Sequence, residues 1–308
     1  MARKLRFLDD RCLFAGQDGP LTVWDITTPV IDGQCLFAPG VDLARIVLGV
    51  LAAAQRKWRF ETYAFSFMST HWHLQAGFVD LTDKADVMCF VNGNIARKVN
   101  RLRGRSGPLF ERRNTAIQVL NDAECLDRFA YVMGQGTQAF VVRHPEEDPF
   151  VSANPALLRG ERLMGEWAGE PCEVRLSRLP VLRDLDDDAH RAQVWALADD
   201  IARTCRVRRK KAGRRLQGAE SARRLDPFTR IKVRENTPAP VVHGTKAQEA
   251  AWRIAYASAR TAYTAARIAF QAWLSDPESP LLRWPPCTLP PAWPRAPRID
   301  STAAREGP

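Results

Sequence analysis

The chain has 308 residues, of which 45% are hydrophobic and 26% charged. These proportions exclude global disorder and suit one large domain or two ordinary ones. The formal net charge of +10 favours a polyanionic partner. Nucleic acid is the first candidate, because phosphate contacts supply most non-specific affinity; an anionic membrane surface is the weaker alternative.

The seven cysteines are scattered and include no Cys-x-x-Cys pair. This argues against a zinc ribbon or a disulfide framework and favours a reducing compartment. The first ten residues lack the apolar stretch of a signal peptide. The longest apolar run, residues 46–54, is far too short to span a bilayer. We therefore expect a cytoplasmic protein with no membrane partner.

The periodicity of apolar residues predicts a series of elements in the first half of the chain. In order, they are a strand over 21–27, a short strand over 34–38, a helix over 42–57, strands over 60–68 and 71–78, a basic-ended helix over 83–102, a strand within 109–120, and a helix capped by Asn121 or Asp122. The order strand, helix, strand, strand, helix is typical of an α+β fold of ferredoxin-like type, an antiparallel sheet with helices on one face.

Beyond residue 150 the sequence predicts a mainly helical, basic extension. A helical pattern from Asp186 ends in the arginine- and lysine-rich run 206–215, and the prolines within 225–244 indicate a linker or extended arm. Residues 246–274 form the clearest helix, and the proline-rich tail after Pro285 is expected to be extended. We expect one domain over 1–150 and an extension over 151–308 that supports target recognition without taking part in chemistry.

The strand over 71–78 opens with His71-Trp72-His73. Side chains two residues apart in a strand point to the same face, so the two imidazoles lie side by side. Neutral imidazole is a common ligand of divalent metals. The alternative is two histidines on a half-buried strand that bind nothing.

Four separated segments together resemble a known family. His71-Trp72-His73 resembles the His-hydrophobic-His motif of HUH single-strand endonucleases. Residues 91–100 resemble the helix that follows this motif in REP-associated, single-tyrosine transposases, residues 110–113 their basic strand, and residues 128–136 their catalytic helix. Further segments are similar to a long-tailed branch of the family: Leu179-Pro180, residues 237–240, the helix over 246–274 and residues 285–291.

The resemblance implies that residues 1–150 form an HUH single-tyrosine transposase domain, which cleaves and rejoins single-stranded DNA. In that chemistry a tyrosine hydroxyl attacks a phosphodiester, leaving a 5′-phosphotyrosine and a free 3′ hydroxyl. The implied cofactor is a divalent metal, Mg²⁺ or Mn²⁺, which polarises the scissile phosphate. The implied partner is single-stranded or hairpin DNA, and a homodimer is left open.

The resemblance also implies roles for individual residues. Tyr131 is the implied nucleophile; of the other three tyrosines, Tyr63 suits a core, and Tyr256 and Tyr263 lie on the apolar stripe of a long helix. Gln135 lies one helical turn beyond Tyr131, on the same helix face. The implied metal ligands are His71, His73 and Gln135, and the implied DNA-binding residues are Arg97, Arg101, Arg103, Arg105, Arg112 and Arg113.

The chain departs from the family pattern at several positions. Thr70 stands where an asparagine usually precedes the first histidine, Gln135-Gly136 replaces a common Asn-Pro, and Asn114 replaces a common aromatic. Two other classes of function therefore stay open. One is a catalytically inactive DNA-binding protein on the same fold; the other is a metal-dependent hydrolase of small molecules, against which the net charge argues.

Overall fold

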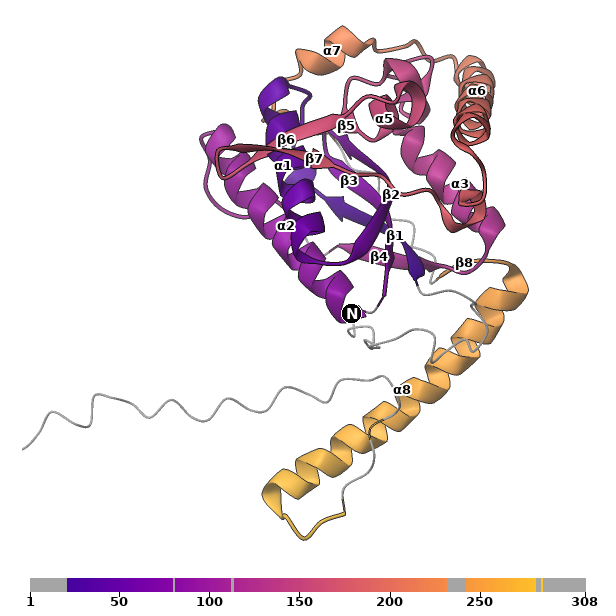
Figure 1. Cartoon of the computed structure of the whole chain (residues 1–308). Helices are drawn as coiled ribbons and strands as arrows, with labels where there is room; N and C mark the ends of the chain where they lie inside the picture. Colours follow the sequence, from indigo (N-terminus) through magenta and orange to yellow (C-terminus); the bar gives the residue numbers. More distant parts are fainter. Residues whose placement is uncertain (1–20, 80, 112–113, 232–241, 281–283, 285–308) are drawn as a thin grey trace, which may run out of the picture.

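The computed structural model describes residues 21–79, 81–111, 114–231, 242–280 and 284. A six-stranded sheet of order β5-β2-β3-β1-β4-β8 lies at its centre (Figure 1). Its strands are antiparallel except for the parallel pair β4 and β8. The strands are β1 (Thr22–Pro29), β2 (Phe60–Met68), β3 (His71–Phe78), β4 (Thr115–Val119), β5 (Val151–Ser152) and β8 (Val242–His243).

The first four strands have the order β4-β1-β3-β2, which confirms the predicted ferredoxin-like α+β fold. Helices α1 (Val41–Lys57) and α2 (Leu81–Leu102) cover one face, where the Trp72 indole of β3 donates to Asn92 Oδ1 of α2 at 3.2 Å. Helix α3 (Asp122–Met133) covers the opposite face, where Gln75 of β3 donates to Cys125 O at 2.9 Å. The expectation of helices on one face therefore holds for α1 and α2, and α3 adds a layer on the other side.

Because both faces are covered, β2 and β3 are buried along nearly their whole length instead of alternating between core and solvent. Phe67 stacks on Trp72 with ring centroids 4.7 Å apart, and Phe37 meets Phe67 edge-on at 5.4 Å. Tyr63 is fully buried in this core, as its position in the sequence predicts, and its hydroxyl donates to Glu61 Oε2 at 2.9 Å.

The rest of the described chain adds short elements and two long helices around this unit. They are α4 (Gln135–Gln138), α5 (Asn154–Arg159), β6 (Leu163–Trp167), β7 (Glu170–Val174), α6 (Asp187–Lys211), α7 (Ala219–Arg223), α8 (Lys246–Ser275) and 3-10 turns at Ile31–Gly33, Pro145–Glu147 and Pro180–Leu182. Helix α6 packs against α3, α4 and α5, and the hydrophobic core continues to Cys205. The domain division at residue 150 stays a prediction.

Helix α8 is anchored at its first turns and extends away from the sheet (Figure 1). Trp252 packs with Leu120 and Val242, and Tyr256 stacks on Trp252 with ring centroids 4.8 Å apart, so Tyr256 has the expected packing role. No helix in the ranges that the structure describes is long and apolar enough to cross a bilayer.

Several predicted elements differ from the structure. Residues 34–38 form turns, with Gln34 in an isolated bridge to Arg230, instead of a strand. Among the described residues of 109–120, only β4 is a strand, and Phe110 makes an isolated bridge to Val30. The predicted arm over 225–244 ends in β8, and the tail after Pro285 lies outside the described residues.

The β6–β7 hairpin, which periodicity does not indicate, lies directly against α1. The two backbones touch at Gly49 of α1 and Gly165 of β6: a Cβ on Gly49 would lie 1.9 Å from Glu166 O, and a Cβ on Gly165 2.0 Å from Gly49 N. Only residues without a side chain permit this approach.

We expect Gly49→Ala to lower the free energy of unfolding by about 2 kcal/mol or more, because the hairpin must move away from α1. Gly93→Ala is the matched control: Gly93 also lies inside a helix, α2, but nothing lies within 4 Å of its Cβ position. There the better helix propensity of alanine should raise stability by about 0.5–1 kcal/mol. Urea unfolding measures both variants, and equal effects would contradict the close packing.

Candidate active site

The two histidines at the start of β3 point to the face covered by α3, with ring centroids 4.9 Å apart. Each Nδ1 faces a threonine hydroxyl: Thr70 Oγ1 lies 3.1 Å from His71 Nδ1, and Thr27 Oγ1 lies 2.9 Å from His73 Nδ1. Thr70, the departure from the family pattern, thus helps to orient His71. An imidazole whose Nδ1–H donates to a hydroxyl keeps its Nε2 lone pair free for another partner.

Burial keeps this pair neutral. Loss of water lowers the pKa of His71, an effect that its contact with Gln135 partly offsets. The pKa of His73 lies well below the usual range, because of burial first and then the neighbouring His71 and Arg128. Neutral imidazole is the form that binds metal ions.

Helix α3 carries Tyr131 to the same place. Its N-terminus is capped by Asn121, whose side chain accepts a hydrogen bond from Glu124 N at 2.9 Å. The Tyr131 ring stands perpendicular to the His73 ring, with centroids 5.3 Å apart. Tyr131 therefore lies close to the histidines of β3, as predicted.

Gln135 reaches the site from a separate short helix, whereas the sequence predicts one continuous helix through Tyr131 and Gln135. Helix α3 ends at Met133, and α4 begins at Gln135 after Gly134. A Cβ on Gly134 would lie 2.8 Å from Ile201 Cγ2 of α6, so the close approach of α6 accompanies the break. The Gln135 amide nevertheless points to the histidines, because its Oε1 lies 3.5 Å from His71 Nε2. The amide nitrogen of the same Gln135 side chain donates to Tyr131 O at 2.9 Å.

Three further polar side chains, which the sequence did not single out, form a cluster that reaches Tyr131 through Arg128. The Arg128 guanidinium stands over the Tyr131 ring, 4.6 Å from its centroid, and Arg128 Nη1 lies 3.9 Å from Asp25 Oδ2. His243 of β8 brings its Nε2 to 3.3 Å from the same carboxylate oxygen. Asp25 is only 5% exposed, and a buried carboxylate requires such partners. The available signals were an acid inside an apolar strand and an arginine one helical turn before Tyr131.

The predicted DNA-binding arginines of α2 do not join this group. Helix α2 covers the other face of the sheet, and three of the four predicted arginines in α2 and directly after it bind the protein itself. Arg97 donates to Asn94 Oδ1 at 2.8 Å, Arg103 to Leu36 O at 3.2 Å and Ala38 O at 3.0 Å, and Arg105 to Asn100 Oδ1 at 2.6 Å and Pro108 O at 3.1 Å. Arg101 is exposed, and Arg112 and Arg113 lie outside the described residues.

The residues that converge fit a divalent cation. His73 is 4% exposed, and its Nε2 has no hydrogen-bond partner, which is costly for a buried polar atom without a ligand. The amide oxygen of Gln135 is a ligand that hard cations accept. Within the ranges that the structure describes, no group of three or more His, Cys, Asp and Glu side chains is placed to hold a metal. The present set is two imidazoles and an amide.

No family model and no curated protein matches this chain. Among solved structures, a REP-associated tyrosine transposase bound to a REP hairpin is similar at 15% sequence identity and a TM-score of 0.39. The match covers 55% of this chain and 93% of that chain.

Helix α4 rests on a buried acid, Asp148. Its Oδ1 accepts a hydrogen bond from Phe150 N at 3.0 Å, and its carboxyl group would lie 2.8 Å from a Cβ on Gly136 of α4. Burial raises the pKa of Asp148 to about 7, although the backbone N–H groups of Phe150 and Gly136 counteract the rise.

A carboxyl pKa that is higher in the folded than in the unfolded state contributes stability below the unfolded value and loses it as pH rises through the folded value. We therefore expect the contribution of Asp148 to the free energy of unfolding to fall between about pH 4 and pH 8, whereas the lowered pKa values of His71 and His73 make stability rise with pH up to about 6.5. Asp148→Asn should remove this fall, so that stability rises more with pH than in the wild type, whereas Asp127→Asn, at an exposed position on α3, should not. Urea unfolding across this pH range measures both, and identical curves for the two variants would contradict the role of Asp148.

Proposed function

We propose that this protein is a metal-dependent, single-strand DNA endonuclease and transposase that cleaves and rejoins DNA through a 5′-phosphotyrosine on Tyr131. One observation carries the proposal: two imidazoles, an amide oxygen and a tyrosine meet on the α3 face of β3, from segments about 60 residues apart. The chain has four tyrosines. Tyr63 is fully buried. On α8, Tyr256 packs against Trp252 of the same helix, and Tyr263 packs against Trp284, which follows the helix.

His71, His73 and Gln135 would hold the divalent metal, Mg²⁺ or Mn²⁺. When bound, such an ion polarises a phosphate and offsets the negative charge that develops on its oxygens. The remaining chemistry belongs to the chain. The Tyr131 hydroxyl loses its proton to water as its oxygen bonds to phosphorus. The bond from phosphorus to the 3′ oxygen breaks, and this oxygen takes up a proton from water and leaves as a 3′ hydroxyl. Rejoining reverses these steps without ATP, because the phosphotyrosine conserves the phosphodiester bond.

Arg128 supplies positive charge over the ring of the proposed nucleophile. Its guanidinium lies over the Tyr131 ring and is oriented by Asp25, which His243 also contacts. Tyrosine is a weak nucleophile at neutral pH, since a phenol ordinarily titrates near pKa 10. A cation at this position attracts the phosphate and offsets the negative charge that develops on its oxygens.

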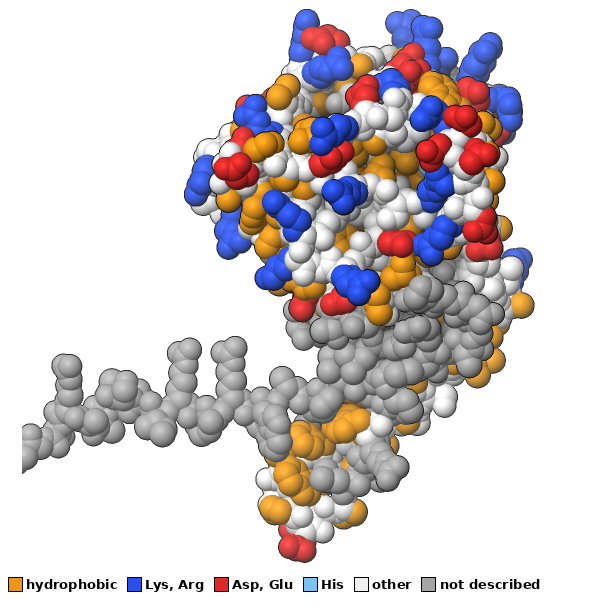
Figure 2. All heavy atoms as spheres, viewed as in Figure 1, with side chains coloured by type: hydrophobic (Ala, Val, Ile, Leu, Met, Phe, Trp, Pro, Cys, Tyr) orange, Lys and Arg blue, Asp and Glu red, His pale blue; other side chains and the backbone are white. Residues whose placement is uncertain are grey.

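The partner that we propose is single-stranded or hairpin DNA in the cytoplasm, in keeping with the net charge of +10. Figure 2 shows that Lys and Arg side chains gather at the end of the molecule where α6 and α7 lie in Figure 1. We propose residues 1–150 as the cleaving unit and the extension as the part that recognises the target, with β8 of the extension completing the sheet beside the site.

Tyr131→Phe should abolish the covalent protein–DNA adduct and leave DNA affinity nearly unchanged, because only one oxygen is lost. Labelled single-stranded hairpin DNA with Mn²⁺, analysed on a denaturing gel, measures the adduct; fluorescence anisotropy measures binding. Tyr256→Phe and Tyr263→Phe are the matched controls and should keep the adduct. An undiminished adduct from Tyr131→Phe would refute the assignment. A wild-type protein that binds DNA but never forms an adduct would be a DNA-binding protein on the same fold.

His71→Ala and His73→Ala should each lose metal-dependent cleavage, because each removes an imidazole ligand. Gln135→Ala should weaken cleavage and raise the Mn²⁺ concentration that is required. Isothermal titration calorimetry with Mn²⁺ measures metal binding directly, and this readout is independent of activity. His190→Ala on α6 serves as the control for loss of a histidine elsewhere. Equal Mn²⁺ binding by wild type and both site variants would exclude a metal at this position.

Arg128→Gln should slow adduct formation at saturating DNA by roughly tenfold or more, because the positive charge over the Tyr131 ring is lost. Arg128→Lys should restore part of the rate, since it keeps the charge without the planar guanidinium. Comparing the two variants separates a role in the reaction, seen in the rate of adduct formation, from the structural pairing of Arg128 with Asp25. Thermal unfolding measures the effect of each variant on that pairing. If both variants react at the wild-type rate, Arg128 serves only to balance the buried carboxylate.

A further inference from the structure

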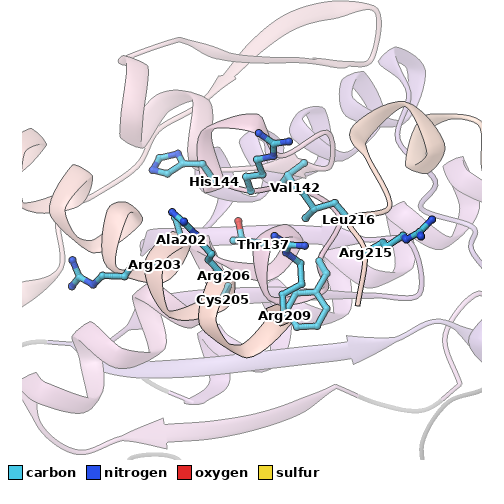
Figure 3. A pocket seen from close by; sticks show the side chains of 12 residues that line it. Thr137, Val142, His144, Ala202, Arg203, Cys205, Arg206, Arg209, Arg215 and Leu216 are labelled. Carbon is cyan, nitrogen blue, oxygen red and sulfur yellow. The ribbon is translucent and has the colours of Figure 1, made fainter. Parts of the chain in front are cut away.

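A pocket lined by arginines opens between α4, α6 and the chain around residues 140–144 (Figure 3). Its volume is about 840 Å³, within the range of about 300–1,000 Å³ that is typical of ligand sites. We name it the arginine pocket after the side chains that line it: Arg143, Arg203, Arg206, Arg209 and Arg215. None of its lining residues belongs to the site at His71 and Tyr131.

The pocket is a built part of the fold. Its rim, residues 215–218, is held by backbone hydrogen bonds from Gln217 N to Phe140 O and from Gly218 N to Val141 O, both 2.9 Å. Phe140, a buried wall residue, has a φ of 59°, in the left-handed region that non-glycine residues seldom adopt. Such a conformation costs about 1 kcal/mol or more and persists only where the surrounding structure imposes it.

The charges in the pocket are largely unbalanced. Arg203 pairs with Asp200, and Arg209 donates to Arg214 O at 3.3 Å. Within the described part of the chain, no ion pair or side-chain hydrogen bond involves the guanidinium groups of Arg143, Arg206 and Arg215. Cations gathered in this way repel one another unless an anion lies between them.

A buried hydroxyl indicates where that anion would sit. Thr137 lines the floor of the pocket and is 2% exposed, yet its Oγ1 has no hydrogen-bond partner. Figure 3 shows the hydroxyl among the arginines. A buried hydroxyl left unpaired costs about 1–3 kcal/mol, and a phosphate oxygen would accept its hydrogen bond.

We propose that the arginine pocket binds a backbone phosphate of single-stranded DNA outside the cleavage position, with Arg143, Arg206 and Thr137 as its principal contacts. The identity of the ligand as a DNA strand rests on the proposed function. Its location supports the link, because Thr137 lies two residues beyond Gln135 on the same short helix. Because side chains two residues apart on a helix point to roughly opposite sides, a strand held at Tyr131 would pass around α4 and place a phosphate further along the strand in the pocket.

The test uses the full chain and a fluorescein-labelled oligo-dT 20-mer in EDTA, so that binding is measured without cleavage. The double variant Arg143→Ala/Arg206→Ala should lower the slope of log affinity against log salt by about 1.4, since each lost phosphate contact on a single strand contributes about 0.7. Arg208→Ala/Lys211→Ala is the matched control: it removes two cations of α6 that do not line the pocket and should leave most of the slope. Thr137→Val should weaken binding a few-fold without changing the slope.

Equal slopes for the pocket and control variants would overturn the proposal. If an oligo-U RNA binds more tightly than oligo-dT and loses more affinity in the pocket variant, the ligand is RNA. If low millimolar inorganic phosphate displaces the labelled strand, the ligand is a small anion. Either result also overturns the proposal. The absence of an adduct from wild type in Mn²⁺ would refute the proposed cleavage alone, because the slopes in EDTA do not depend on it. Thermal unfolding verifies that each variant is folded.

Discussion

The alternation of side chains along β3 is the constraint on which the rest of the structure depends. The side chains of alternate residues from Trp72 to Phe78 pack towards α2, and those of alternate residues from His71 to Gly77 face α3. A slip of one residue would exchange the two faces. The register is held on both sides, by β1 over eight residue pairs and by β2 through the stacking of Phe67 on Trp72. The histidines are therefore positioned by the tryptophan between them.

The two faces of the sheet divide stability from chemistry. Towards α1 and α2 the interface is aromatic and aliphatic, and its burial stabilises the fold. Towards α3 the sheet presents buried polar groups beside the histidines, and Asp25, Ser66 and Gln75 each have a side-chain atom without a hydrogen-bond partner. Each such atom costs about 1–3 kcal/mol. The candidate site therefore lies on a face where buried polar atoms lack partners.

The sequence predicted the elements that have a strong period. Helix α1, strands β2 and β3, and helices α2 and α8 agree with their apolar patterns to within a few residues, because each buries a regular stripe or strand. The β6–β7 hairpin escaped notice because its strands are five residues long, and β8 because it has only two residues. Periodicity is not visible over such lengths.

The candidate site was predictable where spacing alone suffices. His71 and His73 follow from strand alternation, and Gln135 follows Tyr131 by one turn even though Gly134 interrupts the helix. Asp25, Arg128 and His243 come from three distant segments, and their meeting depends on the order of strands in the sheet. The role of Arg103 was equally hidden, since no local pattern tells an arginine that binds backbone carbonyls from one that binds phosphate.

The parallel pairing of β4 with β8 has a consequence for the order in which the protein matures. His243 on β8 approaches Asp25 on β1, so residues about 220 positions apart complete one cluster beside Tyr131. A chain emerging from the ribosome can fold β1 to β4 and place its histidines early, but it lacks β8 and His243 until α6 and α7 have been synthesised. The cluster around Asp25 is therefore completed late, by the strand that joins the edge of the sheet.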